Sequence, residues 1–414
     1  MSPTLRTAWI LGAVALASLV LSDLLTAIAV AVVVVLAATD AWVVRRVHRA
    51  DRTIGEVMSR GVGSELVIEV EDRIDRTELR QPGTPDLRVD VMDSPGGLTG
   101  SVTPLRRGHH TLPAMAIRVR GPLGLGQWTR TVGAAHAVQV FPDMPAARRI
   151  ASQVRHSLFR IDGLRIRGSL GLGTAFDSIR EYVDGDDVRR VNWPASARHR
   201  SPMVNQYQIE QDRDVICVID CGRLMGAPVG DLSRLDAAVD AAAAIAAVAD
   251  VVGDRVGVVA FDRTVLRDLA PLRRGGEVVA KSIFDLEPSK FESDYRLAFE
   301  RVAGAKRAFV LVLTDLLDVA AARPLAEAIP ILARKHAVAV ATVADPDVAK
   351  ALTNRPLSTL DAARAVVAAD VIEARIGAVG EVARHGATVI DVHQRQLNAA
   401  CVAAYLEAKA RVRF

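Results

Sequence analysis

The sequence has few aromatic residues and few cysteines. Aromatic side chains make up 4% of the 414 residues, although half of all residues are hydrophobic. Proteins that bind single-stranded nucleic acid stack bases on aromatic side chains, so this composition argues against nucleic acid as a partner. Three cysteines cannot build a framework of several disulfides, which favours a reducing compartment. The high hydrophobic content excludes an intrinsically disordered chain.

The sequence also lacks a strong charge excess and the common catalytic motifs. Its 52 basic and 48 acidic residues leave a net charge of +4, without the one-sided charge of a phosphate-binding surface. It contains no HExxH, P-loop or G-x-S-x-G sequence. These absences lower the expectation of an enzyme without excluding one. The length predicts two or three domains.

A long apolar run near the N-terminus is the first feature that is present. Only Asp23 and Asp40 carry charge between residues 8 and 44. One straight helix over this run would be roughly 55 Å long, whereas the hydrocarbon core of a bilayer measures about 30 Å. We therefore predict two short transmembrane helices within residues 1–44, with a turn at Ser22 and Asp23. A cleaved signal peptide is the alternative.

The charges that flank this run predict its orientation. The flanking basic residues are Arg6 on one side and Arg45, Arg46, Arg49 and Arg52 on the other. Cytoplasmic flanks of membrane helices carry an excess of lysine and arginine. We therefore expect a multi-pass protein of the plasma membrane, with both termini and the soluble domains in the cytoplasm.

Residues 45–145 alternate between apolar and polar side chains. Leu66, Ile68 and Val70, for example, alternate with glutamates, and further runs of this kind are separated by turns that contain glycine and proline. A period of two is typical of strands with one buried face. We predict a β-rich, sandwich-like module without a catalytic constellation.

Residues 146–210 form an arginine-rich connector. Its glycine-rich stretch, residues 168–173, follows no apolar strand and precedes no Gly-Lys-Ser/Thr, so we interpret it as a loop rather than as a phosphate site. The segment from Arg180 to Arg198 combines dense charge of both signs with Tyr182 and Trp193. It is either a clamp between domains, in which arginines pair with carboxylates, or a surface that docks a partner.

The same segment reads R-x-Y-x-x-G-D-x-x-R-x-x-N-W-x-x-S-A-R and resembles the signature of the bacterial family called domain of unknown function 58. The residues that match the signature, and that we expect in the clamp or docking surface, are Arg180, Tyr182, Gly185, Asp186, Arg189, Asn192, Trp193, Ser196 and Arg198. The resemblance implies an N-terminal helical membrane hairpin, a β-rich region and a module similar to the von Willebrand factor A domain. It also implies association with a MoxR-type AAA+ ATPase.

Residues 211–414 alternate between apolar strands and helices. The predicted strands cover residues 215–220, 255–261, 264–270, 309–313, 337–343 and 387–392, and the predicted helices residues 235–252, 276–286, 293–302, 325–335, 361–384 and 397–408. Apolar strands that alternate with helices are typical of a parallel sheet covered on both faces. We predict an α/β domain of Rossmann type, which the resemblance identifies as von Willebrand A-like. Ligands in such folds bind at the carboxyl ends of the strands.

Two acids, Asp220 and Asp315, follow strands of this predicted sheet. The resemblance implies a metal site there, built from D-x-S-x-S, a later hydroxyl and a later aspartate. Asp220, Ser293 and Asp315 fit three of these positions, whereas Gly222 and Leu224 replace the two serines of the motif. Oxygen ligands suit a hard cation, so Mg²⁺ is the one cofactor that this degenerate site suggests.

The polar groups near this strand end also have other interpretations. The two acids can instead bond to loop amides or pair with Arg223. Cys217 lies within a predicted buried strand and is expected in the core, whereas Cys221 is a candidate reactive thiol.

Taken together, these features predict an interaction or assembly protein rather than an enzyme. We expect it to be anchored in the membrane, to face the cytoplasm and to dock a protein partner, a MoxR-type AAA+ ATPase, on its von Willebrand A-like domain. One alternative is a divalent-metal-dependent hydrolase that uses Asp220 and Asp315. The other is a structural protein of the cell envelope.

Overall fold

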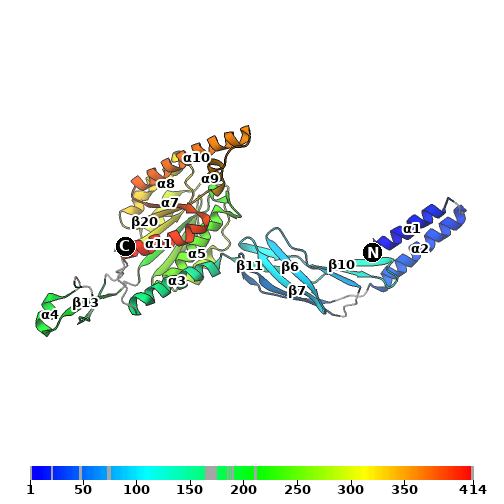
Figure 1. The fold of residues 1–414 in the computed structure, drawn as a ribbon, viewed down its shortest axis with the longest axis horizontal. Coiled ribbons are helices and arrows are strands. Elements are labelled where there is room, and N and C mark those ends of the chain that lie inside the picture. Colours follow the sequence, from blue (N-terminus) through cyan, green and yellow to red (C-terminus); the bar gives the residue numbers. More distant parts are fainter. Residues whose placement is uncertain are drawn as a thin grey trace. The chain divides into compact units, whose positions relative to one another are not determined.

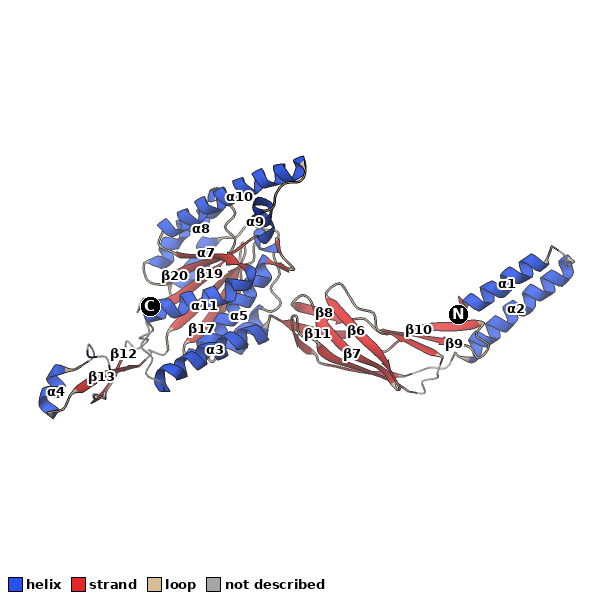
Figure 2. Ribbon diagram, in the orientation of Figure 1, coloured by secondary structure: helices blue, strands red, loops and turns tan. Residues whose placement is uncertain are grey.

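The computed structural model describes residues 2–19, 22–45, 49–71, 76–163, 175–183, 186, 188, 191–208 and 212–411. Helices and several separate sheets are both present in this part of the chain, so the protein is of mixed α/β class (Figures 1 and 2). The chain divides into two compact units, residues 1–140 and residues 141–414. The boundary lies at the end of strand β11 (His136–Phe141).

Two apolar helices, α1 (Leu5–Ala17) and α2 (Asp23–Val43), begin the first unit. Helix α2 has 21 residues and is about 32 Å long, and among the described helices it alone is long and apolar enough to cross a membrane. Helix α1 has 13 residues and measures about 20 Å, which is shorter than a span. The prediction of two helices with a turn at Ser22 and Asp23 thus corresponds to one helix of spanning length, which already begins at Asp23, and one shorter apolar helix.

The rest of the first unit consists of short strands in three sheets. The strands are β1 (Ser2–Pro3), β2 (Ala50–Ile54), β3 (Val57–Ser59), β4 (Ser64–Val70), β5 (Thr77–Arg80), β6 (Leu87–Ser94), β7 (Gly97–Pro104), β8 (Gly108–Leu112), β9 (Met115–Arg120), β10 (Gly126–Val132) and β11. Their orders are β1-β10-β9-β5, β3-β11-β8 and β2-β4-β7-β6, and the pairs in the first and third sheets are antiparallel. The period-two pattern correctly predicted a strand with one buried face here. Leu66, Ile68 and Val70 face one core, while their neighbours in the strand are more exposed.

The second unit is built on a six-stranded sheet in the order β18-β17-β14-β19-β20-β21. These strands are β14 (Asp214–Asp220), β17 (Arg255–Phe261), β18 (Val265–Arg273), β19 (Ala308–Leu313), β20 (Ala337–Ala344) and β21 (Thr388–His393). All pairs are parallel except that of the edge strand β18 with β17. The chain leaves β14 toward β17 and later returns to its other side as β19. The carboxyl ends of β14 and β19 therefore form a topological switch point.

Helices cover both faces of this sheet, which explains its continuous apolar strands. One face packs against α5 (Arg234–Val252), α6 (Gly276–Ile283) and α11 (Gln394–Ala410), with α3 (Met144–Gly163) packed on α5, and the other against α7 (Tyr295–Ala303), α8 (Val319–Ala333) and α10 (Thr359–Arg384). The helix α9 (Pro346–Thr353) packs on α10. Helix α5 is rich in alanine and buried along most of its length, and a capping box of Ser233 and Asp236 begins it.

Two predicted boundaries differ from the structure for local reasons. The helix expected from residue 325 begins at Val319, because the Asp318 side chain accepts the N–H of Ala321 and caps the earlier turn. The first part of the connector is helix α3, whose Ala147 and Ala151 lie in the core beside α5. Its arginines lie between alanines spaced four residues apart, which is the spacing of one helix face.

The remaining connector forms a small hairpin. Strands β12 (Ala175–Glu181) and β13 (Met203–Gln208) pair antiparallel, and the short helix α4 (Trp193–His199) lies between them in sequence. A further two-stranded ribbon, β15 (Pro228–Val229) and β16 (Leu232–Ser233), precedes α5. The glycine-rich stretch 168–173 lies outside the described residues.

Candidate functional site

The carboxyl ends of β14 and β19 bring two polar residues together at the switch point. Asp220 is the last residue of β14, and Thr314 directly follows β19. Because the two strands are parallel neighbours, these residues meet, and the Thr314 hydroxyl donates to Asp220 Oδ2 at 2.6 Å. Both residues are 3% exposed, so their contact is shielded from water.

The Asp220 carboxylate is surrounded by hydrogen-bond donors. The backbone N–H of Gly222 donates to Oδ1 at 2.7 Å, and the hydroxyl of Ser293 donates to the same oxygen. The Tyr295 hydroxyl donates to Oδ2 at 2.9 Å, beside the Thr314 hydroxyl. A buried carboxylate needs such bonds to compensate for the water it has lost. The sequence predicted Asp220 and Ser293 as site residues, and the structure brings them into direct contact.

Tyr295 is a site residue that sequence reasoning missed. It begins helix α7 after Asp294, whose side chain caps the helix by accepting the N–H of Leu297 at 3.1 Å. Its ring packs edge-on against Phe261, with ring centroids 5.6 Å apart. Burial, together with the negative charge of Asp220, raises the pKa of Tyr295 well above its usual value, so the phenol stays neutral and donates. Its position two residues after Ser293, a predicted site residue, is the feature of the sequence that could have indicated it.

Asp315 points toward arginines rather than toward Asp220. Its Oδ1 lies 2.5 Å from Arg234 Nη1 and 3.3 Å from Arg375 Nη1, and it accepts a bond of 3.3 Å from the Thr342 hydroxyl. Arg375 also forms two bonds to Asp391, at 2.9 and 3.0 Å. Burial lowers the pKa of Arg375, but its bonds to Asp391 and Asp315 outweigh this effect and raise it overall. The result is a network of two acids and two guanidinium groups, in which Arg234 and Asp315 are buried, Arg375 is partly buried and Asp391 is exposed.

The polar residues at the strand ends contact one another and nearby arginines rather than leaving an open cation site. A Cβ atom at Gly222 would lie 2.1 Å from Ser293 Oγ, so the Ser293 hydroxyl fills the space of the first missing serine. Asp315, the expected second carboxylate, is neutralised by Arg234 and Arg375. Mg²⁺ is bound by oxygen ligands, usually one or two carboxylates together with several waters. Within the described residues, no cluster of three or more potential His, Cys, Asp or Glu ligands is present.

Exposed side chains surround this closed polar interior. Phe291 is 48% exposed, and the Arg263 guanidinium lies 4.3 Å from the centre of its ring. Arg223 and Glu292 form an exposed ion pair of 2.6 Å, and the backbone N–H of Arg223 donates to the Phe291 carbonyl. Leu317, two residues after Asp315, is 41% exposed. We call these exposed residues, Arg223, Arg263, Phe291, Glu292 and Leu317, the strand-end rim.

The signature segment forms its hydrogen bonds largely within itself. The Arg180 guanidinium makes a two-pronged contact with Asp186, at 2.7 and 2.8 Å, and Asp186 also accepts the N–H of Val183 at 2.9 Å. The Tyr182 hydroxyl donates to the Asp186 carbonyl at 3.3 Å. These contacts close the turn after β12. Gly185 and Arg189 of the signature lie outside the described residues.

Other signature residues hold α4 against β13. Asn192 Oδ1 accepts the N–H of Ala195 and caps the helix, while its amide donates to Asn205 at 2.8 Å. The Ser196 hydroxyl donates to the Asn192 carbonyl and accepts the N–H of Met203, both at 2.8 Å. Among the described signature residues, Trp193 is 70% exposed, and Arg198 is exposed as well.

Two further candidates from the sequence lie in packed interiors. Cys217 and Cys221 are both fully buried, as is Cys401.

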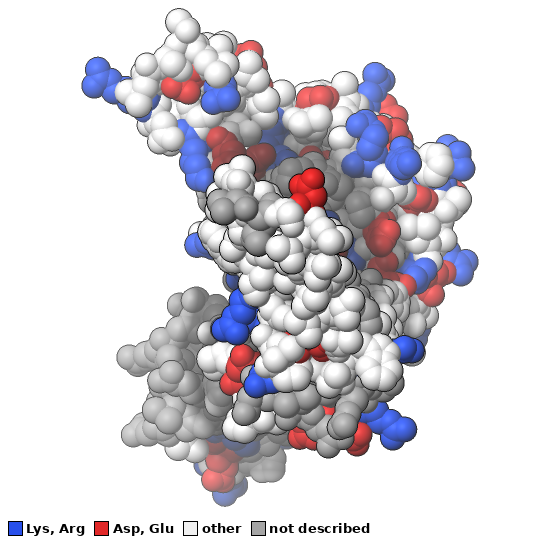
Figure 3. All heavy atoms as spheres, turned by 90° about the vertical axis from the view of Figure 1, so that its right-hand side faces the viewer, with Lys and Arg blue, Asp and Glu red and all other residues white. Residues whose placement is uncertain are grey.

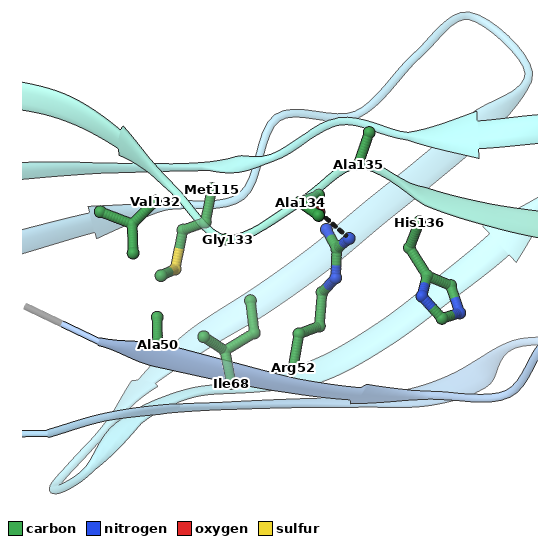
Figure 4. A pocket seen from close by; sticks show the side chains of 9 residues that line it. All are labelled: Ala50, Arg52, Ile68, Met115, Val132, Gly133, Ala134, Ala135 and His136. Atoms are coloured by element: carbon green, nitrogen blue, oxygen red, sulfur yellow. Dashed lines mark hydrogen bonds between the residues drawn. The ribbon is translucent and has the colours of Figure 1, made fainter.

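Arg52, counted above among the charges that flank the membrane run, lies beside a cavity of about 180 Å³ in the first unit (Figure 4). It donates to the carbonyls of Pro113 at 2.8 Å and Ala134 at 2.7 Å, so it ties strands of that unit together.

The chain is similar to one protein family and to proteins of two mycobacteria. The family model described as "Protein of unknown function DUF58" matches residues 178–387, about half of the chain, including the whole signature and both strand ends. "Uncharacterized protein Mb1516" of Mycobacterium bovis and "Uncharacterized protein Rv1480" of Mycobacterium tuberculosis are each 27% identical to the chain over 199 residues. The match covers 45% of this chain and 61% of each relative, which is less than two thirds of the relatives' length.

Proposed function

The chain belongs to the DUF58 family of proteins of unknown function, and on that premise we propose that it is a membrane-anchored protein whose α/β unit docks a protein partner with the strand-end rim. The observation that carries this proposal is a contrast at the carboxyl ends of the strands. The acids inside are fully engaged with donors and arginines, whereas aromatic and charged side chains are exposed around them. A substrate pocket needs polar groups that are free to bind a ligand.

The composition of the rim supports a protein partner. Aromatic residues and arginine are enriched at the centres of protein interfaces and contribute most of their binding free energy. Phe291 offers a ring that Arg263 holds in place without covering it, so little side-chain entropy is lost on binding. Helices and strands beneath the rim keep its loops in position, since Asp294 donates its N–H to the Asp262 carbonyl and links two of them.

For the second unit, we propose the von Willebrand A-type arrangement that the family resemblance implies. The strand order, with its parallel strands and one antiparallel edge, supports it. So does the position of Asp220 and Thr314 at the switch point. In this interpretation the metal site is replaced by a closed network of hydroxyl groups and arginines.

We further propose that α2, with α1 beside it, anchors the chain in the plasma membrane with the soluble units in the cytoplasm. The length of α2 and its exposed apolar side chains support the anchor. Figure 3 views the chain from the side of these helices, and the nearest atoms are mainly uncharged. Arg6, Arg45 and Arg49 are exposed at their base and fit the positive-inside rule, whereas Arg52 is engaged inside the β strands and Arg46 lies outside the described residues.

The partner class that we propose for the rim is a MoxR-type AAA+ ATPase, as the resemblance implies. The test is a photoreactive amino acid at position 291 of the full-length chain in native membranes. The matched control places it at Leu272, which is 41% exposed on the edge strand β18. We expect a cross-link to one ATPase from position 291 and none from position 272. Equal cross-linking from both positions, or none from position 291, would contradict docking at the rim.

The two alternatives make different predictions. A divalent-metal-dependent hydrolase requires Mg²⁺ or Mn²⁺ to bind near Asp220 and Asp315, and heat on calorimetric titration at millimolar metal would favour it. A structural envelope protein requires that rim substitutions have no effect while loss of α2 does. The hydrogen bonds of Asp220 and the ion pairs of Asp315 favour docking over the metal-dependent hydrolase. The exposed Phe291 favours docking over the structural envelope protein.

A further inference from the structure

Asp40 is one of two acids in the apolar N-terminal run, yet it is almost completely buried. It lies in the last turn of α2 and is 3% exposed. Its carboxylate oxygens accept the backbone N–H groups of Leu123 and Leu125, both at 2.8 Å, and of Gly126 at 2.9 Å. Bonds from several amides offset the cost of burying the charge. We call the donor segment, residues 121–126 from the end of β9 to the first residue of β10, the clasp loop.

Helix α1 is attached to the same loop. The Thr4 hydroxyl donates to the Gly124 carbonyl at 2.5 Å, and the Thr7 hydroxyl donates to the Leu125 carbonyl. Strand β1, just before α1, pairs with β10 directly after the loop. Figure 1 shows β10 beside the base of both helices. One loop therefore fixes both apolar helices to the β strands of the first unit.

The clasp loop lies directly on the helix backbone. A Cβ atom at Gly126 would lie 2.2 Å from the Ala37 carbonyl oxygen and 2.6 Å from the Ala41 nitrogen, so only glycine allows this approach. The bonds to Asp40 and the close approach at Gly126 together make the connection rigid.

Apolar and aromatic side chains are exposed at the level of the clasp loop. Trp42 lies two residues after Asp40, and Trp9 lies two residues after Thr7. Each tryptophan is therefore about 3 Å along its helix from a residue that contacts the clasp loop. They are 63% and 75% exposed, and Leu123 in the clasp loop itself is 56% exposed. Tryptophan is enriched where a membrane protein crosses the lipid headgroup layer.

Exposed basic residues surround the same level. Arg6 lies against the clasp loop, since its Nη1 is 3.1 Å from the position of a Cβ at Gly124. Arg45 follows α2. The carbonyl of Arg76 accepts the N–H of Arg120, the last residue before the clasp loop, so Arg76 also lies near this loop. Arg6, Arg45 and Arg76 are all exposed. Basic side chains near a bilayer surface are attracted to anionic lipids.

The length of α2 from the clasp loop back to its first residue is close to the hydrocarbon thickness of a bilayer. The 17 residue steps from Asp40 back to Asp23 amount to about 26 Å, close to the hydrocarbon thickness of about 30 Å. If the clasp loop lies at one surface, the start of α2 with Asp23 therefore reaches the other surface.

We propose that the clasp loop is a membrane-binding element of the β strands, seated in the headgroup layer of an anionic bilayer. Leu123 enters the layer beside Trp9 and Trp42, the arginines contact anionic headgroups, and Asp40 holds the loop in place. This inference rests on the proposed membrane anchor and extends it, because the first unit then stands directly on the bilayer rather than on a flexible tether.

The test measures the depth of a probe in the full-length chain, reconstituted in vesicles of phosphatidylcholine and phosphatidylglycerol. Leu123→Cys is labelled with an environment-sensitive fluorophore. The matched control is Val57→Cys, which is 63% exposed on β3, the strand that pairs with β11 at the other end of the unit. The native cysteines are fully buried, and burial raises the pKa of the Cys401 thiol to about 12, so labelling is selective. Flotation of the vesicles reports the anchor independently of the probe.

We expect the chain to float and headgroup-attached nitroxide to quench the probe at position 123 severalfold more than the probe at position 57. Floating chains with equal quenching at both positions would overturn this inference and leave the anchor intact. Chains that do not float would overturn the anchor as well. Asp40→Ala in the Leu123→Cys chain should still float but lose most of the extra quenching. Unchanged quenching in that variant would overturn the role of Asp40.

Discussion

The Asp315 carboxylate lies 2.5 Å from the Arg234 guanidinium, and both side chains are buried at the switch point of the sheet. A carboxylate that serves a cation site would keep its oxygens free and its surroundings negative. Here Arg375 approaches the same oxygen, so positive charge already occupies the place of a cation. This relationship is the main physical reason to interpret the strand-end face as a structural platform.

Asp315→Asn is predicted to destabilise the chain strongly. The substitution leaves Arg234 buried without its carboxylate, and breaking a buried ion pair on one side costs about 3–5 kcal/mol. The measurement is the midpoint of chemical unfolding of the full-length protein in detergent. The control is Arg223→Ala, which breaks an exposed pair with Glu292 and should cost less than about 1 kcal/mol. A cation site without bound metal would give the opposite result, since removal of a repelling carboxylate would stabilise it.

Tyr295→Phe is predicted to weaken the Asp220 network and to change the dependence of stability on alkaline pH. Loss of the hydroxyl deprives buried Asp220 of a donor and should cost about 1–3 kcal/mol at neutral pH. In the native protein burial and Asp220 raise the pKa of Tyr295, whereas an unfolded tyrosine ionises near pH 10. The unfolded state therefore binds fewer protons above about pH 10, and the tyrosine's contribution to stability, complete below that pH, is lost as pH rises.

Unfolding free energies measured from neutral pH upward check this prediction. Wild type should lose stability above about pH 10 more steeply than Tyr295→Phe, because the variant lacks one group whose ionisation favours unfolding. Parallel curves for the two proteins would show that Tyr295 ionises freely in the folded chain and would contradict its closed position.

Gly222→Ser is predicted to destabilise the chain although it restores a serine of the metal motif. The new Cβ would meet the Ser293 hydroxyl at 2.1 Å. Ser293→Gly alone removes one donor to Asp220, but in the double variant it makes room for the new side chain. The two effects should therefore be non-additive by about 0.5–3 kcal/mol in a double-mutant cycle of unfolding free energies. Additive effects would show that the two positions do not compete for the same space.

Much of the fold follows from the sequence because local patterns determine it. The alternation at Leu66, Ile68 and Val70 predicted a half-buried strand, and the apolar run that ends at Asp220 predicted a buried one. The alternation of apolar strands and helices also predicted that Asp220 and Asp315 lie at the carboxyl ends of strands, and the structure makes these strands, β14 and β19, neighbours. Periodicity records which face of a segment is buried, and these assignments need no more than that.

The partners of the acids could not be predicted in this way. Asp315 is 81 residues from Arg234 and 60 residues from Arg375 in sequence, and Asp40 is more than 80 residues from its amide donors. Pairs at such separations depend on how helices and loops pack, which no local pattern records. Backbone amide donors have no sequence signature at all. The arginines of α5 and α10 and the acid Asp391 were consequently missed, while Asp315, which both arginines contact, was identified.

If the strand-end rim binds a partner protein, substitutions in the rim should change the affinity of the chain for a purified MoxR-type ATPase. Phe291→Ala should weaken binding by about 2 kcal/mol, roughly thirtyfold, as expected for an aromatic residue at the centre of an interface. Leu272→Ala, a matched exposed position on β18, should bind as tightly as wild type. Equal affinities of the wild-type, Phe291→Ala and Leu272→Ala proteins for the ATPase would show that the strand-end rim is not the docking surface.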